Sequence, residues 1–271
     1  MKSKFIYLLA FVLIILESCS YNDERIIDTD IAVVESYLLP YQAINVKLSK
    51  LYLYTEDGET EDEEFISDAL VTIITDTGSY LLSYDESIQK YIGEDNNLIA
   101  VPDTDYSLEI NYNDVILTSS TTVPLKPDSV KLSEEVLVIE SGHLGPGQNE
   151  GAITVSWLRP DNQSQYQVII EYLDEEYDPI FDFMESDAYD NFRILSTPPI
   201  TGDTYNINQR QLIFYGNYQI IIQSINEEYA DLYEDIGQST QNLTQPLTNI
   251  ENGFGIFTGV NSDTVQLRVS N

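Results

Sequence analysis

Residues 106–122 read YSLEINYNDVILTSSTT, and a short polar break at Asn113 and Asp114 divides this stretch into two halves. The first half alternates apolar with polar side chains, and the second is rich in β-branched residues. Both patterns are typical of β-strands with one buried face. Asn and Asp favour the tight turn that joins two antiparallel strands. The stretch therefore predicts a β-hairpin.

The hairpin ends a longer series of predicted strands. Upstream of it, short runs rich in β-branched or aromatic residues, separated by polar turns, are found at 31–39, 44–48, 69–75, 80–84 and 90–92. About seven short strands without a helical period predict a β-sandwich. We therefore expect an immunoglobulin-like or transthyretin-like domain over residues 31–126.

An acidic stretch at 56–64, EDGETEDEE, interrupts this series. Carboxylates could bind calcium, but the fixed spacing of oxygen ligands in an EF-hand is absent. Repulsion between like charges favours a solvated loop instead.

Val123-Pro124-Leu125-Lys126-Pro127 marks the expected seam between two domains. Two prolines so close together keep the chain extended and interrupt both helix and sheet. We expect this seam and the stretch 56–64 to be the segments most exposed to proteases. Beyond the seam, 130–139 is predicted to be a strand and 141–147 a glycine-rich loop.

Ile153 to Pro160, ITVSWLRP, followed by the strand Tyr166 to Ile170, resembles the second and third strands of a fibronectin type III module. The resemblance implies that Trp157 packs in the core and that Tyr218 is the later core tyrosine. We thus predict a second β-sandwich over 127–271. An insertion over 174–205, which such modules normally lack, interrupts it.

Residues 227–236 are predicted to form the one short helix of this domain. Asn226 is a suitable N-cap, acidic residues fill the first turn, and Gly237 can end the helix. An apolar stripe, consisting of Tyr229, Leu232, Tyr233 and Ile236, has helical spacing. Such a stripe usually faces a core, although an aromatic face that stacks on a ligand is the alternative.

The first 19 residues have the layout of a bacterial lipoprotein signal. Lys2 and Lys4 precede a short apolar run, and Leu16-Glu17-Ser18 leads into Cys19, the only cysteine. This layout predicts a signal peptide over 1–18, acyl chains on Cys19 and a polar tether over 19–30. The acyl chains would hold the protein in outer-membrane lipid. Residues 20–24, SYNDE, resemble the export signal of Bacteroidota-type lipoproteins, which implies the outer face of that membrane, with its periplasmic leaflet as the alternative.

Composition excludes several classes of function. The formal charge of −34 argues against binding nucleic acid. His143 and Cys19 are the only histidine and cysteine, so a zinc site of ordinary composition is excluded. No nucleophile elbow, phosphate loop or dinucleotide motif is present. We therefore expect a non-enzymatic protein with no cofactor.

Four motifs extend along nearly the whole mature chain in the order seen in one family. They are Val33 to Leu38, Asp68 to Ile73, Asp105 to Ile110 and the terminal Asn249 to Phe257, NIENGFGIF. The chain thus resembles the Bacteroidota outer-membrane lipoproteins called domain of unknown function four-two-four-nine. Such proteins are often encoded beside TonB-dependent receptors. The resemblance implies an accessory role in uptake and supplies no catalytic residue.

Two functions follow as hypotheses: an accessory of a TonB-dependent transporter, or a stand-alone surface adhesin or structural lipoprotein. The terminal motif also has two interpretations. Ile250, Phe254 and Phe257 could pack inward and close the second sandwich. Alternatively, a partner interface could be formed by Asn249, Gly253, Phe254, Gly255 and Phe257, with glycine allowing close approach of the backbone.

Overall fold

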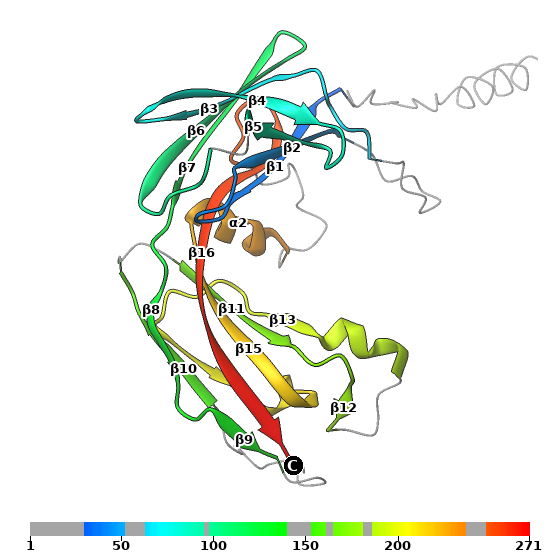
Figure 1. Ribbon diagram of the computed structural model, residues 1–271, viewed down its shortest axis with the longest axis vertical. Helices are drawn as coiled ribbons and strands as arrows, with labels where there is room; N and C mark the ends of the chain where they lie inside the picture. Colours follow the sequence, from blue (N-terminus) through cyan, green and yellow to red (C-terminus); the bar gives the residue numbers. More distant parts are fainter. Residues whose placement is uncertain are drawn as a thin grey trace, which may run out of the picture.

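The computed structural model describes residues 30–51, 63–94, 98–139, 153–160, 165–180, 186–236 and 248–271. These residues are mostly β-structure and form two units joined at a narrow waist (Figure 1). Signal peptide 1–18, Cys19 and His143 lie outside the described residues, as does most of 56–64. No helix in the described part of the chain is long and apolar enough to cross a membrane.

The first unit contains seven strands within the described residues. They are β1 (Ala32–Leu38), β2 (Asn45–Lys50), β3 (Leu70–Thr75), β4 (Gly78–Asp85), β5 (Lys90–Gly93), β6 (Thr104–Tyr112) and β7 (Val115–Val123). They neighbour one another in the order β1-β2-β5-β4-β3-β6-β7. Asn113 and Asp114 have φ values of 49° and 63°, as a two-residue hairpin turn requires. The predicted strand series and hairpin are confirmed.

The core of this unit follows from the alternation in its strands. In β6, the side chains of Leu108, Ile110 and Tyr112 are buried, whereas those of Glu109 and Asn111 between them are exposed. Period two places these two sets on opposite faces of the sheet.

The second unit is a sandwich of two sheets. Its strands are β8 (Asp128–Leu132), β9 (Val136–Val138), β10 (Ile153–Leu158), β11 (Gln165–Tyr172), β12 (Asp178–Pro179), β13 (Ile194–Ser196), β14 (Thr204–Ile207), β15 (Phe214–Ile225) and β16 (Phe254–Ser270). One sheet has the order β14-β10-β8, and the other continues β13-β11-β15-β16. Two short strands, β12 and β9, also join the second sheet by pairing with β15 and β16. The two-sheet arrangement agrees with the predicted β-sandwich. The helical elements are two 3₁₀-helices, Ser186–Phe192 and Gln209–Gln211, and α2 (Glu227–Ile236).

Trp157 and Tyr218 occupy the core positions that the sequence predicts. Trp157 is 3% exposed, and its ring centroid lies 5.4 Å from that of Tyr166. The Tyr218 hydroxyl donates to the carbonyl of Phe214 and accepts from its N–H, both at 2.9 Å. Burial raises the pKa of Tyr218, so the phenol remains a neutral donor.

Three expectations about the second unit are wrong in detail. The strand predicted over 130–139 is divided into β8 and β9, which join different sheets. The insertion over 174–205 includes β13 and the first half of β14, which are regular strands of the sandwich. At the seam, Pro124 and Pro127 are buried rather than exposed, because the carbonyl of Pro124 accepts a hydrogen bond from Asn261.

Strand β16 belongs to both units (Figure 1). Its first part, from Phe254 to Gly259, pairs in parallel with β1, and its continuation from Val260 pairs antiparallel with β15. All residues from Ile256 to Asn261 are buried, because the strand is covered where the units meet.

The residues at and just before the start of β16 pack in a different core from the one predicted. Ile250 and Phe257 pack with the residues of β1–β7, and not in the second sandwich as expected. Phe254 is only partly buried. Since a parallel partner can lie anywhere later in the sequence, no local pattern indicates this pairing.

Candidate functional site at the waist

The start of α2 is bound to the first unit by polar contacts. The Glu228 carboxylate accepts hydrogen bonds from Thr121 at 2.6 Å and from Thr258 at 3.1 Å. The Thr121 hydroxyl in turn accepts from the N–H of Gly259 at 3.0 Å. Thr121 and Thr258 are buried, and hydrogen bonds to a charged group are stronger than neutral ones. This network therefore fixes α2, β7 and β16 to one another.

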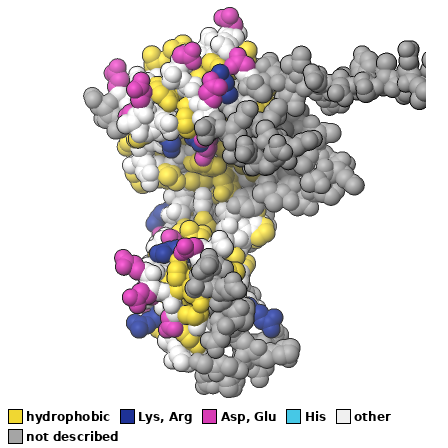
Figure 2. All heavy atoms as spheres, turned by 90° about the vertical axis from the view of Figure 1, so that its right-hand side faces the viewer, with side chains coloured by type: hydrophobic (Ala, Val, Ile, Leu, Met, Phe, Trp, Pro, Cys, Tyr) yellow, Lys and Arg dark blue, Asp and Glu magenta, His cyan; other side chains and the backbone are white. Residues whose placement is uncertain are grey.

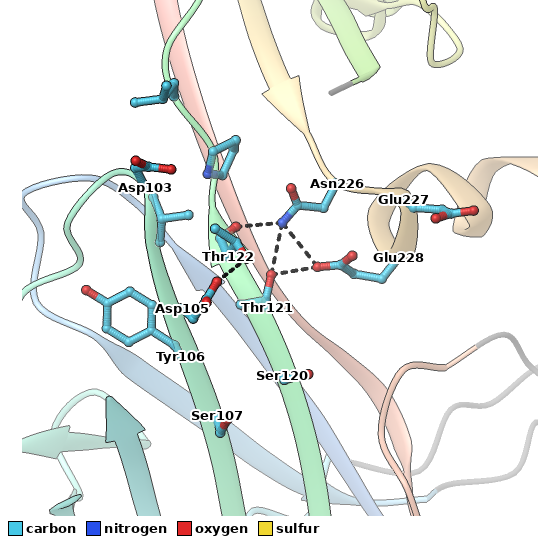
Figure 3. A pocket seen from close by; sticks show the side chains of 13 residues that line it. Asp103, Asp105, Tyr106, Ser107, Ser120, Thr121, Thr122, Asn226, Glu227 and Glu228 are labelled. Carbon is cyan, nitrogen blue, oxygen red and sulfur yellow. Dashed lines mark hydrogen bonds between the residues drawn. The ribbon is translucent and has the colours of Figure 1, made fainter. Parts of the chain in front are cut away.

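Asn226 joins the same network, in a way that differs from its predicted role as a side-chain cap. Its backbone carbonyl accepts the N–H of Tyr229 and of Ala230, so the helix does begin here. Its side-chain amide instead donates to the carbonyl of Thr122 at 2.7 Å and reaches Thr121 at 2.9 Å. Figure 3 shows Asn226 and Glu228 pointing together toward β7.

The apolar side of α2 also faces the first unit. The Tyr229 ring meets the Tyr37 ring of β1 edge-on, with 6.1 Å between centroids, and it packs beside Val260. The prediction that the helical stripe faces a core is thus met at Tyr229. The side chains of Tyr233 and Ile236 lie outside the described residues.

A groove of about 780 Å³ lies beside this network. Its walls come from β6, β7, the seam and the start of α2 (Figure 3). Four carboxylates, those of Asp103, Asp105, Glu227 and Glu228, line it together with the hydroxyls of β6 and β7, and no Lys or Arg does. The second groove, of about 550 Å³, shares Ser107, Ser120 and Glu228 with it and continues toward Asn249 and Glu251.

The groove can accept hydrogen bonds and attract positive charge. Two of its carboxylates already accept hydrogen bonds within the protein. Glu228 accepts them from Thr121 and Thr258, and Asp105 accepts one from Thr122. Among the described residues, no three His, Cys, Asp or Glu side chains are grouped as a metal ion needs. The arrangement is therefore better suited to a cationic organic group than to a coordinated metal.

The five predicted interface residues lie at the start of β16, against the first unit. The Asn249 side chain donates to the carbonyl of Phe257 at 2.7 Å and accepts from its N–H at 3.0 Å. Phe257 is fully buried. Gly255 has a φ of 104°, and a Cβ there would overlap the carbonyl oxygen of Val34. A Cβ on Gly253 would strike Leu117. These contacts assign the segment to closing the first unit.

A comparison with protein families shows which family this chain is related to. The model for a domain of unknown function, DUF4249, matches residues 20–266. The chain belongs to the DUF4249 family. No curated protein matches the chain closely enough to count as a relative. The DUF4249 match includes the part of β16 that crosses the waist, from Phe254 to Asn261, so the connection between the units lies inside the family's domain.

The terminal motif NIENGFGIF, which suggested DUF4249, is the segment that brings β16 across the waist. Sequence analysis missed Thr121, Glu228 and Thr258 as a network. The run of hydroxyl residues at 118–122 was a signal, since five consecutive Ser and Thr residues exceed what one exposed strand face needs. The partners of those hydroxyls could not be predicted, because they come from distant strands.

Proposed function

We propose that this DUF4249 chain is a non-enzymatic lipoprotein of the outer membrane. Acyl chains on Cys19 would hold it in the membrane, facing the cell exterior. There it would assist a TonB-dependent β-barrel transporter in capturing or admitting a substrate. The sequence supports the non-enzymatic role, because it contains no nucleophile elbow, phosphate loop or dinucleotide motif.

The main support for this proposal is that the two units share strand β16 and the contacts of α2. Because β16 runs through both units and Glu228 ties α2 to β7, the two units keep a fixed relation to each other. A fixed body can hold one partner with one unit and present the other unit to a second molecule. Figure 2 shows one face of the molecule, with Asp and Glu side chains on both units and hydrophobic side chains near the waist.

Affinity purification from cells tests the role. The tagged full chain would be cross-linked on intact cells, and the outer membrane would then be solubilised in detergent. We expect a β-barrel transporter to co-purify. If no β-barrel transporter co-purified from cells that produce TonB-dependent transporters, the result would contradict the proposal and favour the adhesin alternative.

The anchor has its own test. Cys19→Ala should abolish acyl modification, because the thiol is the attachment atom, and the protein should appear in the soluble fraction or as uncleaved precursor. Membrane fractionation and mass spectrometry of the amino-terminal peptide measure this. A processed Cys19→Ala protein that stayed in the membrane would contradict the lipid anchor.

A further inference from the structure

An exposed apolar surface lies where β1 ends and the segment 98–101 passes beside it. We call it the waist platform, and its members are Leu39, Tyr41, Ile99 and Val101. They are 40%, 74%, 44% and 42% exposed. Ala100 is completely buried between Ile99 and Val101, and it bridges to Pro40, which lies between Leu39 and Tyr41. This pairing turns all four large side chains toward solvent on neighbouring segments.

Hydrogen bonds hold the platform's backbone in place. The N–H of Tyr41 donates to the carbonyl of Ala100 at 2.8 Å, and the N–H of Ala100 donates to Gln42 at 3.0 Å. From below, the buried hydroxyl of Tyr106 accepts from the N–H of Val101 at 2.8 Å. These four side chains are therefore exposed on an ordered backbone, and not because the loop lacks structure. An apolar surface organised before binding loses little entropy when a partner docks.

Tyr41 is the most informative member. It has a φ of 62°, a left-handed conformation that is uncommon and strained for a bulky residue. Glycine or asparagine would form this turn with less strain. A tyrosine held in such a turn with most of its ring in solvent is suited to contacting another molecule. Tyrosine is also enriched at the energetic centres of interfaces.

The charge beside the platform restricts what can dock. Val101 leads into Asp103 and Asp105, which line the acidic groove with Glu227 and Glu228. Tyr106 connects the two features, since it lines the groove and its hydroxyl supports the platform. An apolar contact at the platform therefore lies next to a groove that attracts positive charge.

We propose that the waist platform and the acidic groove together bind a polypeptide segment of another protein in which Lys or Arg stands beside apolar side chains. The apolar side chains would cover Tyr41 and Ile99, and the cationic group would enter the groove between Asp103 and Glu227. This inference deepens the proposed function by naming the face and the chemistry of the partner contact.

Charge argues against two other occupants. A second copy of this chain would bring another acidic groove and a total charge of −34 toward the first, and like charges oppose association. An anionic lipid surface would be repelled for the same reason. The cross-linking experiment described next would identify either of these two occupants.

Photo-cross-linking tests the proposal in the full chain. A p-benzoylphenylalanine residue would be placed at position 41, and at position 81 as a matched control. Leu81 is 56% exposed on the first unit but lies on β4, away from the groove. After irradiation of intact cells, mass spectrometry would identify the adduct and its sequence. We expect an adduct at position 41, and not at 81, to a segment of another protein that contains Lys or Arg next to the cross-linked residue.

A charge variant provides the second measurement. Asp103→Asn with Asp105→Asn keeps the size of both side chains, and asparagine accepts the left-handed φ of 57° at position 103. The yield of the position-41 adduct should fall about tenfold, while the Trp157 emission remains that of the folded protein. An unchanged yield would overturn the role of the groove.

The remaining outcomes decide between occupants. An adduct to lipid, an adduct to another copy of this chain, equal adducts at positions 41 and 81, or no adduct would each overturn the docking inference. An adduct to a basic segment of a protein that is not a transporter barrel would support it and contradict the proposed transporter role. The two proposals can therefore fail separately.

Discussion

Gly259 lies where β16 passes closest to β7. A Cβ at this position would be 2.6 Å from both the carbonyl oxygen of Thr122 and the Cα of Val123. Backbone atoms cannot move aside as the end of a flexible side chain can. The absence of a side chain at this one residue therefore allows the two strands to touch, and the hydrogen bond from Gly259 to Thr121 depends on that contact.

Replacement of this glycine should weaken the fold. We expect Gly259→Ala to lower the free energy of unfolding by about 1–3 kcal/mol, as overpacking does. Urea denaturation of the purified protein measures the change. Gly202→Ala is the matched control, since a Cβ there would have only ordinary contacts of 3.6 Å and more. Equal effects of the two substitutions would contradict the close approach.

Trp157 reports on the second unit. Truncation of a buried aromatic side chain leaves a cavity, so Trp157→Ala should lower the free energy of unfolding by about 3–5 kcal/mol. As the only tryptophan, it should emit as a buried indole and shift to longer wavelength on unfolding. A wild-type emission spectrum typical of a solvated indole would contradict its position in the core.

At the scale of elements, β16 pairs with β1 of the first unit and with β15 and β9 of the second. The segment before it is fixed by Asn249, and its first residues supply Phe257 to the core of the first unit. A fragment that ends at the seam lacks this strand. It would expose the edge of β1 and the cavity that Phe257 fills.

Strand supplementation tests this dependence. The fragment 30–126 alone should show no cooperative unfolding, and a synthetic peptide of residues 248–260 should restore it by pairing with β1. Circular dichroism during thermal unfolding measures the transition. The same peptide with Gly255→Val should not restore it, because a Cβ there overlaps Val34. Cooperative unfolding of the fragment without peptide would contradict the assignment.

Local patterns predicted most elements but not the way they join. The 106–122 hairpin, the α2 bounds and the positions of Trp157 and Tyr218 depend on residues close in sequence, and each was predicted. The pairing of β1 with β16 and the contacts of Glu228 depend on residues far apart in the sequence. Neither alternation nor spacing records such partners, so Phe257 was assigned to the wrong core and the waist network was missed.

At the scale of the whole molecule, buried tyrosines link stability to pH. Burial raises the pKa of Tyr91, Tyr106, Tyr112, Tyr172 and Tyr218 above the ordinary value of 10.0. Above that pH an unfolded chain loses these protons more readily than the folded protein does. The contribution of these neutral phenols to the free energy of unfolding is therefore fully present below about pH 10, and it decreases as the pH rises further.

We expect the urea midpoint of unfolding to be lower at about pH 11 than at about pH 8. Tyr218→Phe should reduce this difference, because burial raises the pKa of this phenol more than that of the other four. A midpoint that did not change over this range would contradict the role of buried tyrosines. The comparison of wild type and variant separates this effect from general repulsion among the carboxylates.

The path of β16 also bears on how the protein is made. The ribosome synthesises β1 early and the strand that pairs with it much later, so the first core cannot close while the chain is still emerging. Contacts between residues so far apart in sequence form slowly. Until β16 has been synthesised, the edge of β1 that pairs with it stays without this partner. The strand that stabilises the finished protein thus postpones closure of the first core until synthesis is nearly complete.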